Sequence, residues 1–437
     1  MCPMIRILLL LAVVLLPLRG LQAQTLEIDP IRGSAAALPI AVVPFDYLGV
    51  QVAPDTDVAA VVRADLNRSG SFRTLVERDL VERPLRQSDV NFGTWRLLKQ
   101  DYLLVGRILD DPSGGYRTEF ELFDVAKQER LLGLALNGRP GNMRDIAHQV
   151  ADQVYEKILG VRGAFWTRMA YVTAVGTGRD MTYSLMIADA DGYNPQTVVR
   201  SREPLLSPAW SPDGRRLAYV SFERGASSIY IQDLSTGSRE VVASFKGING
   251  APAFSPDGTR LALALSRTGN PEIYVMDLAS RALTQLTSHW SIDTEPVFSI
   301  DGRSILFTSD RGGKPQIYEV PVAGGEAQRV TFSGQYNARA SLEPGGRIAM
   351  AQGAGNVYRI AVLDRLHGSG GEVRFISPGN LDESPSFAPN GSMILYAARE
   401  NQRGVLYVVS SDARVRQRLV LADGDVREPA WSPFRQR

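Results

Sequence analysis

Residues 208–219 read Pro-Ala-Trp-Ser-Pro-Asp-Gly-Arg-Arg-Leu-Ala-Tyr, and the chain repeats this stretch twice with few changes. Residues 252–263 read Pro-Ala-Phe-Ser-Pro-Asp-Gly-Thr-Arg-Leu-Ala-Leu, and residues 296–307 read Pro-Val-Phe-Ser-Ile-Asp-Gly-Arg-Ser-Ile-Leu-Phe. More divergent copies begin at Ala340, Pro385 and Pro429. The six starts are 44, 44, 44, 45 and 44 residues apart. A period of this length is typical of one four-stranded blade of a β-propeller.

The residues inside each repeat favour strands over helices. Each clear copy carries two prolines or a proline and an Asp-Gly turn, which an α-solenoid of similar period would tolerate poorly. The Ser-Pro-Asp-Gly tetrapeptide predicts a tight turn, because Pro fixes φ and Gly accepts a positive φ. In the first copy we expect the innermost strand to begin just after Pro208, with its aromatic residue facing the neighbouring blade. The next strands are expected at Leu217–Ser221, Ile229–Leu234 and Glu240–Ala243.

The last repeat and the first blade complete each other. Almost no sequence follows Pro429-Ala-Trp-Ser432, whereas Arg168–Thr173 resembles a second strand without a first. Joining the two closes a ring of six blades over residues 164–437 and leaves no free sheet edge.

Residues 38–160 show no repeat and predict a mixed α/β domain. Strands are expected at 38–45, 72–75, 102–108, 116–125 and 130–136. Two stretches carry apolar residues at helical spacing, Val58–Arg68 and Met143–Leu159. The domain boundary is expected at Gly160–Gly163.

The first 23 residues predict a cleaved signal peptide. Arg6 precedes an apolar run over Ile7–Leu18, which is too short to span a bilayer, and Leu21-Gln22-Ala23 resembles a signal peptidase site. The alternative is a retained membrane anchor. Residues 24–37 are then an N-terminal extended segment. Cys2, the only cysteine, would leave with the leader, so the mature chain would hold no disulfide and no thiol nucleophile.

Composition and motifs argue against nucleic-acid binding and against catalysis. The formal net charge is +1, so no basic excess points to nucleic acid or to an anionic membrane surface. The sequence has no Gly-x-Ser-x-Gly elbow and no phosphate loop, and nothing long enough for a hydrolase domain follows the propeller. The three histidines, His148, His289 and His367, show no metal-ligand spacing, and His148 is expected to be exposed or hydrogen-bonded. We therefore expect no enzyme activity.

The whole arrangement resembles the TolB family. The most specific stretches are Asn249–Gly258, Leu265–Gly269, Tyr274–Ser280, Thr294–Pro296, Leu381–Glu383, the terminal Pro-Ala-Trp-Ser-Pro433 and Ile40–Phe45. The resemblance implies a periplasmic, exported protein of the Gram-negative Tol-Pal system. Such a protein binds the lipoprotein Pal across one propeller face and TolA through its N-terminus. It supports outer-membrane invagination during cell division and envelope integrity. Other outer-membrane or peptidoglycan-associated partners are conceivable, and the mature chain would not span the membrane.

Residues just before each recurrent Pro should converge on one mouth of the central channel, forming a polar rim suited to protein recognition. The resemblance selects as Pal contacts Ile248, Asn249, Gly250, Ala251, Thr294 and Glu295. The rim adds Arg339, Asp382, Glu383 and Glu428. Ile248 and the Trp290–Asp293 loop depart from the family pattern. Alternatively, Gly250 serves only backbone geometry, and Glu295 and Glu383 are only solvated carboxylates. The repeated Tyr230, Tyr274 and Tyr318 are expected to pack within blades.

The N-terminal segment gives a second candidate contact. Leu26, Glu27, Ile28 and Asp29 could pair as an extra strand with TolA, or form a disordered terminus. No cofactor is expected, although converging carboxylates at the mouth could hold a cation such as Ca²⁺. Two other functions stay open. One is a propeller that binds a small molecule or sugar in its channel, and the other is a peptidase-related propeller without its hydrolase domain.

Overall fold

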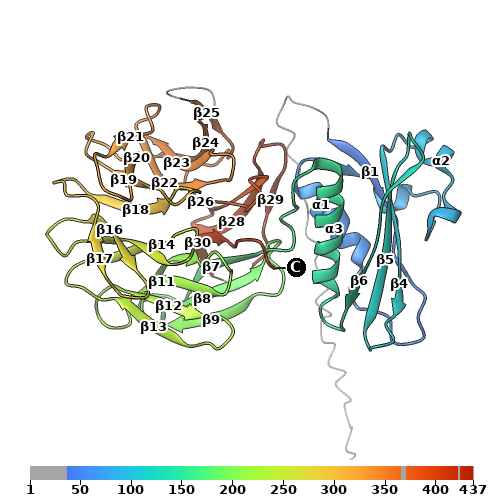
Figure 1. Cartoon of the computed structure of the whole chain (residues 1–437), viewed down its shortest axis with the longest axis horizontal. Coiled ribbons are helices and arrows are strands. Elements are labelled where there is room, and N and C mark those ends of the chain that lie inside the picture. The colour runs from blue at the N-terminus through green and yellow to red at the C-terminus, as the bar shows by residue number, and fades with distance from the viewer. Residues whose placement is uncertain (1–36, 366–370, 422–423, 437) are drawn as a thin grey trace, which may run out of the picture.

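The two predicted domains lie side by side in the computed structural model, which describes residues 37–365, 371–421 and 424–436 (Figure 1). The leader 1–23, most of the segment 24–37 and Leu26–Asp29 lie outside the described residues, as do Cys2 and His367. In the described part of the chain, no helix is long and apolar enough to cross a membrane.

The N-terminal domain is a mixed sheet whose two long helices lie on the side facing the propeller (Figure 1). The strand order is β3-β1-β4-β5-β6, with β2 pairing β4. The strands are β1 (Leu38–Val42), β2 (Asp46–Tyr47), β3 (Phe72–Thr74), β4 (Tyr102–Asp110), β5 (Tyr116–Asp124) and β6 (Glu129–Gly138). The chain runs parallel where β1 meets β3 and β4, and antiparallel from β4 to β6. The predicted mixed α/β class is confirmed.

Helices α1 (Val58–Arg68) and α3 (Met143–Leu159) have the predicted bounds. Asp57 caps the start of α1, since its carboxylate accepts the Ala60 N–H at 2.9 Å. Gly160 ends α3 with a left-handed φ of 73°. Short elements went unpredicted: β2, helix α2 (Phe92–Leu97) and the 3-10 turns η1 (Glu77–Asp79), η2 (Gln87–Asp89) and η3 (Gly178–Asp180). Helix α2 is too short to show a periodicity, and it is held by the fully buried Trp95.

The propeller has six four-stranded sheets, as predicted. The innermost strands are β10 (Leu205–Trp210), β14 (Asn249–Phe254), β18 (Asp293–Phe298), β22 (Tyr336–Leu342), β26 (Glu383–Phe387) and β30 (Asp425–Trp431). The second strands are β7 (Arg168–Val175), β11 (Arg216–Ser221), β15 (Arg260–Leu265), β19 (Ser304–Ser309), β23 (Ile348–Ala354) and β27 (Met393–Glu400). The third strands are β8 (Thr182–Asp189), β12 (Ser228–Asp233), β16 (Glu272–Asp277), β20 (Gln316–Pro321), β24 (Val357–Asp364) and β28 (Arg403–Ser410). The outermost strands are β9 (Gln196–Ser201), β13 (Arg239–Ala243), β17 (Leu283–Gln285), β21 (Gln328–Arg329), β25 (Glu372–Phe375) and β29 (Arg416–Arg418).

The ring closes as predicted, because β30 pairs antiparallel with β7 in the sheet β30-β7-β8-β9. The repeated aromatic residue reaches the next blade: the Trp210 indole N–H donates to the Ala430 carbonyl at 3.0 Å. Tyr230, Tyr274 and Tyr318 are buried, which confirms their packing role.

The predicted start of the innermost strands is wrong. These strands begin before the recurrent Pro and continue through it, since the pairing of β10 with β11 shifts register between Leu206 and Ala209. A β-bulge at this point absorbs the Pro, which cannot donate a ladder hydrogen bond. The rim residues other than Ile248 and Asp382 are therefore part of the inner strands rather than of free loops.

A single apolar core continues from the N-terminal domain into the propeller. Ile146 and Val154 of α3 belong to the same buried cluster as Tyr171 of β7 and Leu406 of β28. Burial of such surface contributes about 25 cal/mol per Å², so this continuity holds the domains together.

Candidate functional site

One backbone conformation recurs in all six blades at the channel mouth. The residue at the bulge of each inner strand has a left-handed φ between 46° and 56°: Ser207, Ala251, Glu295, Arg339, Ser384 and Glu428. None of these is glycine, and this conformation is uncommon for residues with a side chain. Such a conformation persists only where the surrounding structure imposes it. The mouth is therefore a rigid ring of six equivalent positions, including Arg339, where Ala340 replaces Pro.

Arg339 joins four blades across this mouth. Its Nε donates to Glu295 Oε1 at 2.9 Å, and its Nη2 donates to Glu428 Oε2 at 2.8 Å. Its Nη1 donates to the Ser384 hydroxyl. Glu295 also accepts the Arg339 backbone N–H and the Thr308 hydroxyl. The side chain of Arg339 thus bonds directly to those of Glu295, Ser384 and Glu428, which occupy three of the other five bulge positions.

The electrostatics of the mouth follow from this network. Partial burial would lower the pKa of the Arg339 guanidinium, but Glu428 and Glu295 raise it above its already high value. The guanidinium lies where a cation shared by Glu295 and Glu428 would lie. In the described ranges, the one group of His, Asp and Glu side chains spaced for a metal ion is elsewhere, at Asp65, His148 and Asp191. Burial raises the pKa of Asp382 above its ordinary value.

Exposed apolar side chains stand in the segments that lead into the inner strands at this mouth. They lie just before or near the start of four successive inner strands, and we call them the rim crescent: Ile248, Trp290, Ile292, Phe332 and Leu381. Trp290 is 79% exposed and Phe332 is 64% exposed. Large apolar side chains grouped on a surface mark interaction sites, and aromatic residues are enriched among those that anchor protein partners.

A polar hollow completes the site. It has a volume of about 400 Å³ and is lined by Glu295, Tyr336, Tyr358, Asp382 and Arg427, among others. Behind it, a channel region of about 490 Å³ is lined by the repeated Pro and aromatic positions of the blades. The mouth thus combines a charged centre, a hollow and an apolar border, which suits a protein segment more than a small apolar ligand.

The structure brings the ten predicted rim residues to this mouth but gives them different exposures. Ile248 and Glu383 are exposed, whereas Gly250, Ala251, Thr294, Glu295, Arg339 and Glu428 are half-buried. Asn249 and Asp382 are buried instead of facing a partner. The Asn249 amide donates to the carbonyls of Phe245 at 2.8 Å and Ser227 at 3.0 Å. Asp382 accepts the Gly379 N–H. These two side chains hold the loops that present their neighbours.

Sequence reasoning missed most of the rim crescent. Of its members, the sequence predicts only Ile248 as a partner contact; the Trp290–Asp293 loop stands out only as a departure from the family pattern, and Phe332 and Leu381 are not among the predicted contacts. A detectable signal existed, because these apolar residues stand in short segments between an outermost strand and the next inner strand. Such connections are usually polar.

Comparisons with known proteins agree with the fold over nearly the whole chain. The family described as the TolB amino-terminal domain matches residues 26–131, and that described as the TolB beta propeller domain matches residues 155–435. The chain is 71% identical to the Tol-Pal system protein TolB of Xanthomonas oryzae pv. oryzae over 97% of each chain. It is 70% identical to the protein of the same name from Xanthomonas campestris pv. campestris, again over 97% of each. The crystal structure of TolB from Acinetobacter baumannii matches with a TM-score of 0.85 at 42% identity, covering 94% of this chain and all of that one.

Proposed function

This chain belongs to the TolB family of the Tol-Pal system, and from that premise we propose that it is a periplasmic protein–protein adaptor. Its propeller mouth binds the lipoprotein Pal, and its N-terminal segment binds TolA. Joining these partners supports outer-membrane invagination during cell division and envelope integrity. We propose no catalytic role and no cofactor.

The observation that supports the Pal site best is the rigid mouth with its apolar border. Six left-handed positions and the Arg339 network fix the mouth before any partner arrives, so little ordering is needed on binding. Trp290 and Phe332 offer large contact areas beside this charged centre. Apolar anchors around polar, orienting groups are typical of protein interfaces.

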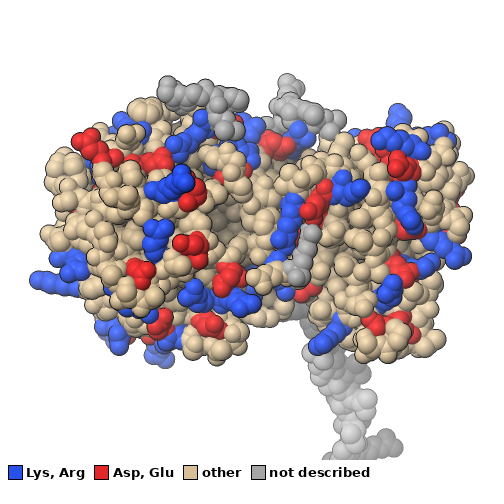
Figure 2. All heavy atoms as spheres, in the orientation of Figure 1, with Lys and Arg blue, Asp and Glu red and all other residues tan. Residues whose placement is uncertain are grey.

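The face drawn in Figure 2 fits a partner recognised locally rather than by long-range charge. Figure 2 shows acidic and basic side chains interspersed over both domains on the face drawn, without a large area of one sign. Recognition must therefore rest on shape and on specific contacts, because no strong field steers a highly charged partner to this face.

A binding experiment tests both sites. We expect residues 24–437 to capture Pal and TolA from an envelope extract, and residues 34–437, which lack Leu26–Asp29, to capture Pal alone. Ala251→Trp adds bulk beside the mouth at a position that already holds a side chain in the left-handed region, so it should weaken Pal capture and leave TolA capture intact. Undiminished Pal capture by this variant would move the Pal site away from the mouth. Capture of neither partner would favour a propeller that binds a small molecule or sugar in its channel.

A further inference from the structure

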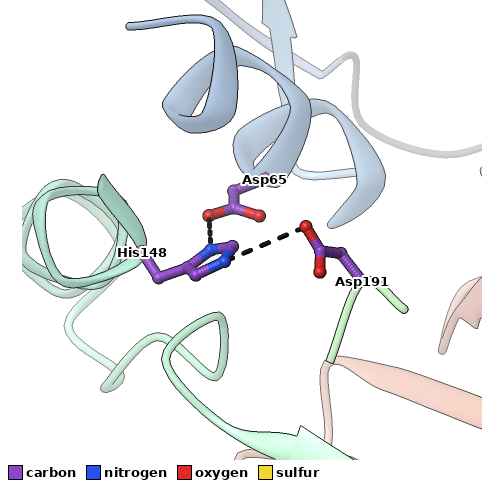
Figure 3. A group of neighbouring side chains, drawn as sticks. All are labelled: Asp65, His148 and Asp191. Atoms are coloured by element: carbon purple, nitrogen blue, oxygen red, sulfur yellow. Dashed lines mark hydrogen bonds and ion pairs between the residues drawn. The ribbon is translucent and has the colours of Figure 1, made fainter. Parts of the chain in front are cut away.

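A buried ionic cluster spans the boundary between the two domains (Figure 3). His148 of α3 and Asp65 of α1 belong to the N-terminal domain, and Asp191 follows β8 in the propeller. The side chains of Asp65 and His148 are 1% exposed, and that of Asp191 is 8% exposed. Charged side chains this deeply buried require partners.

The imidazole of His148 lies between the two carboxylates. Its Nδ1 is 2.6 Å from Asp65 Oδ2, so Nδ1–H donates to that carboxylate. Its Nε2 is 3.9 Å from Asp191 Oδ2, within ion-pair distance, and has no hydrogen-bond partner. In a neutral imidazole, the Nε2 lone pair would face an anion in a buried site. A proton on Nε2 replaces this repulsion with attraction.

We propose that His148, as an imidazolium held between Asp65 of one domain and Asp191 of the other, is a proton-dependent clamp that docks the domains. The clamp requires no partner protein, so it goes beyond the adaptor function. Docking would take up a proton, and the two domains would separate more readily in alkaline than in mildly acidic solution.

The surrounding charges favour a proton in this position. On α1, Arg68 lies 3.0 Å from Asp65, and on α3, Arg144 pairs with Asp191. Asp152 of α3 and Asp189 of β8 complete the charged surroundings. Burial and Arg68 both lower the pKa of His148, but Asp65 and Asp191 raise it above the ordinary value of 6.5. Burial would raise the pKa of Asp191, but His148, Arg68 and Arg144 lower it.

The sign of the pH effect is the same for His148 and for two neighbouring carboxyls, Asp152 and Asp189, whereas the lowered pKa of Asp191 acts only in more acidic solution. The raised pKa of His148 gives a contribution that is complete below 6.5 and is lost as the pH rises through the folded value. Burial raises the pKa of Asp152 and of Asp189 to about 6. The buried carboxyls of Asp152 and Asp189 therefore lower the free energy of unfolding increasingly as the pH rises from 4 to 6, and their effect is constant above pH 6. Acidification from pH 8 to pH 6 should therefore tighten docking.

The same three side chains are close enough to share a metal ion, but other groups already occupy both carboxylates. Asp65 Oδ2 accepts from the imidazole, and a guanidinium group lies against each carboxylate. A divalent cation would have to displace these cations, so the geometry favours a proton.

Proton NMR of histidine side chains tests the clamp directly, since the chain has only three histidines. The His148 signal, identified by its absence in His148→Gln, should titrate with a midpoint above 6.5. Asp191→Asn keeps the acceptor for the Tyr193 N–H but removes the propeller's charge, so it should lower that midpoint. A midpoint below 6.5, or one unmoved by Asp191→Asn, overturns the proposal.

The pH profile of stability gives a second readout. The urea midpoint of unfolding of the wild-type chain should fall between pH 6 and pH 8. His148→Gln should flatten that fall, whereas the control His289→Gln should keep it. Two results would overturn the clamp. A wild-type pH profile in His148→Gln would indicate a structural histidine. If stoichiometric Zn²⁺, added to protein treated with EDTA, shifts the His148 signal and raises the urea midpoint, the cluster is a metal site.

Discussion

The mouth of the propeller and the domain interface are both held by ion pairs, but only the interface contains pairs that are sealed from water. At the mouth, the side chains of Arg339, Glu295 and Glu428 keep 26%, 25% and 15% of their exposure. At the interface, those of His148 and Asp65 keep 1% each. Exposed pairs contribute little to stability because water and salt screen them. Buried pairs are costly to break, because one partner stays charged without water. A partner can therefore reach the ion pairs of the mouth, whereas separating the two domains would uncover the buried charges of the interface.

Removing Asp65 should have the largest effect. Asp65→Ala leaves His148 and Arg68 buried without their carboxylate, so the free energy of unfolding should fall by about 3–5 kcal/mol. Urea unfolding at pH 7, followed by circular dichroism, measures it. Asp55→Ala, an exposed acid before the same helix, should change stability by less than about 0.5 kcal/mol. Equal losses in the two variants would erase the contrast between buried and exposed pairs.

The rim crescent should matter for binding more than for folding. Trp290→Ala should weaken Pal binding by about 2 kcal/mol, or roughly 30-fold, because an exposed aromatic anchor is lost. Calorimetry with a purified soluble domain of Pal measures the affinity. Phe375→Ala, on outermost strand β25 and 48% exposed, is the matched control and should bind normally. If both variants bind alike, the crescent is not the contact surface.

Replacing Arg339 tests how exposed the mouth network is. Arg339→Met leaves Glu295 and Glu428 facing each other, and the free energy of unfolding should fall by about 1–2 kcal/mol in low salt. In 0.5 M NaCl much of this loss should vanish, since salt screens the repulsion between two partly exposed carboxylates. The loss in Asp65→Ala should persist in the same salt. If the loss of stability in Arg339→Met is the same in low salt and in 0.5 M NaCl, the two networks do not differ in their exposure to solvent.

The smallest effect is expected at Asp152, whose carboxyl accepts the Phe165 N–H at 2.8 Å. Burial raises its pKa to about 6. The folded chain therefore holds a proton that the unfolded chain loses, and stability falls as the pH rises from 4 to 6. Asp152→Asn should gain about 1 kcal/mol relative to wild type between pH 4.5 and pH 8.

Asp233→Asn is the control of opposite sign. Hydrogen bonds from Ser235 and Thr236 lower the pKa of Asp233 to about 2, so this variant should lose stability relative to wild type as the pH rises from 2 to 4, and the loss should stay constant above pH 4. Parallel pH profiles in the Asp152 and Asp233 variants would contradict both assignments.

The propeller was predictable because the same tight turn and the same strand pattern recur along the chain. An unclear strand in one copy is identified from the clear strands at the same place in the others. The helices α1 and α3 were predictable because apolar residues recur at helical spacing along each, and because Ser69-Gly70 and Gly160 follow their last turns. Helix α2 was not, because it depends on the burial of Trp95 rather than on its own six residues.

The candidate site was predictable in position but less so in detail. The converging mouth followed from the blade repeat, whereas the burial of Asn249 depends on Ser227 in the preceding blade. The role of His148 depends on Asp65 and Asp191, which lie 83 residues before it and 43 residues after it. Only the fold brings such distant side chains together, so no local pattern reveals them.

The closing strand β30 also sets the order in which the molecule can be completed during synthesis. Asp425 pairs with Ala174, which leaves the ribosome 251 residues earlier. The same late stretch holds the N-terminal domain, since Arg435 bonds Asp145 of α3 at 2.8 Å and accepts from Arg162 through its carbonyl. A nascent or prematurely terminated chain therefore has an unfinished first blade and a loosely attached first domain at once. Both defects expose apolar surface, so proteases and chaperones can distinguish such chains from finished ones by a single late event.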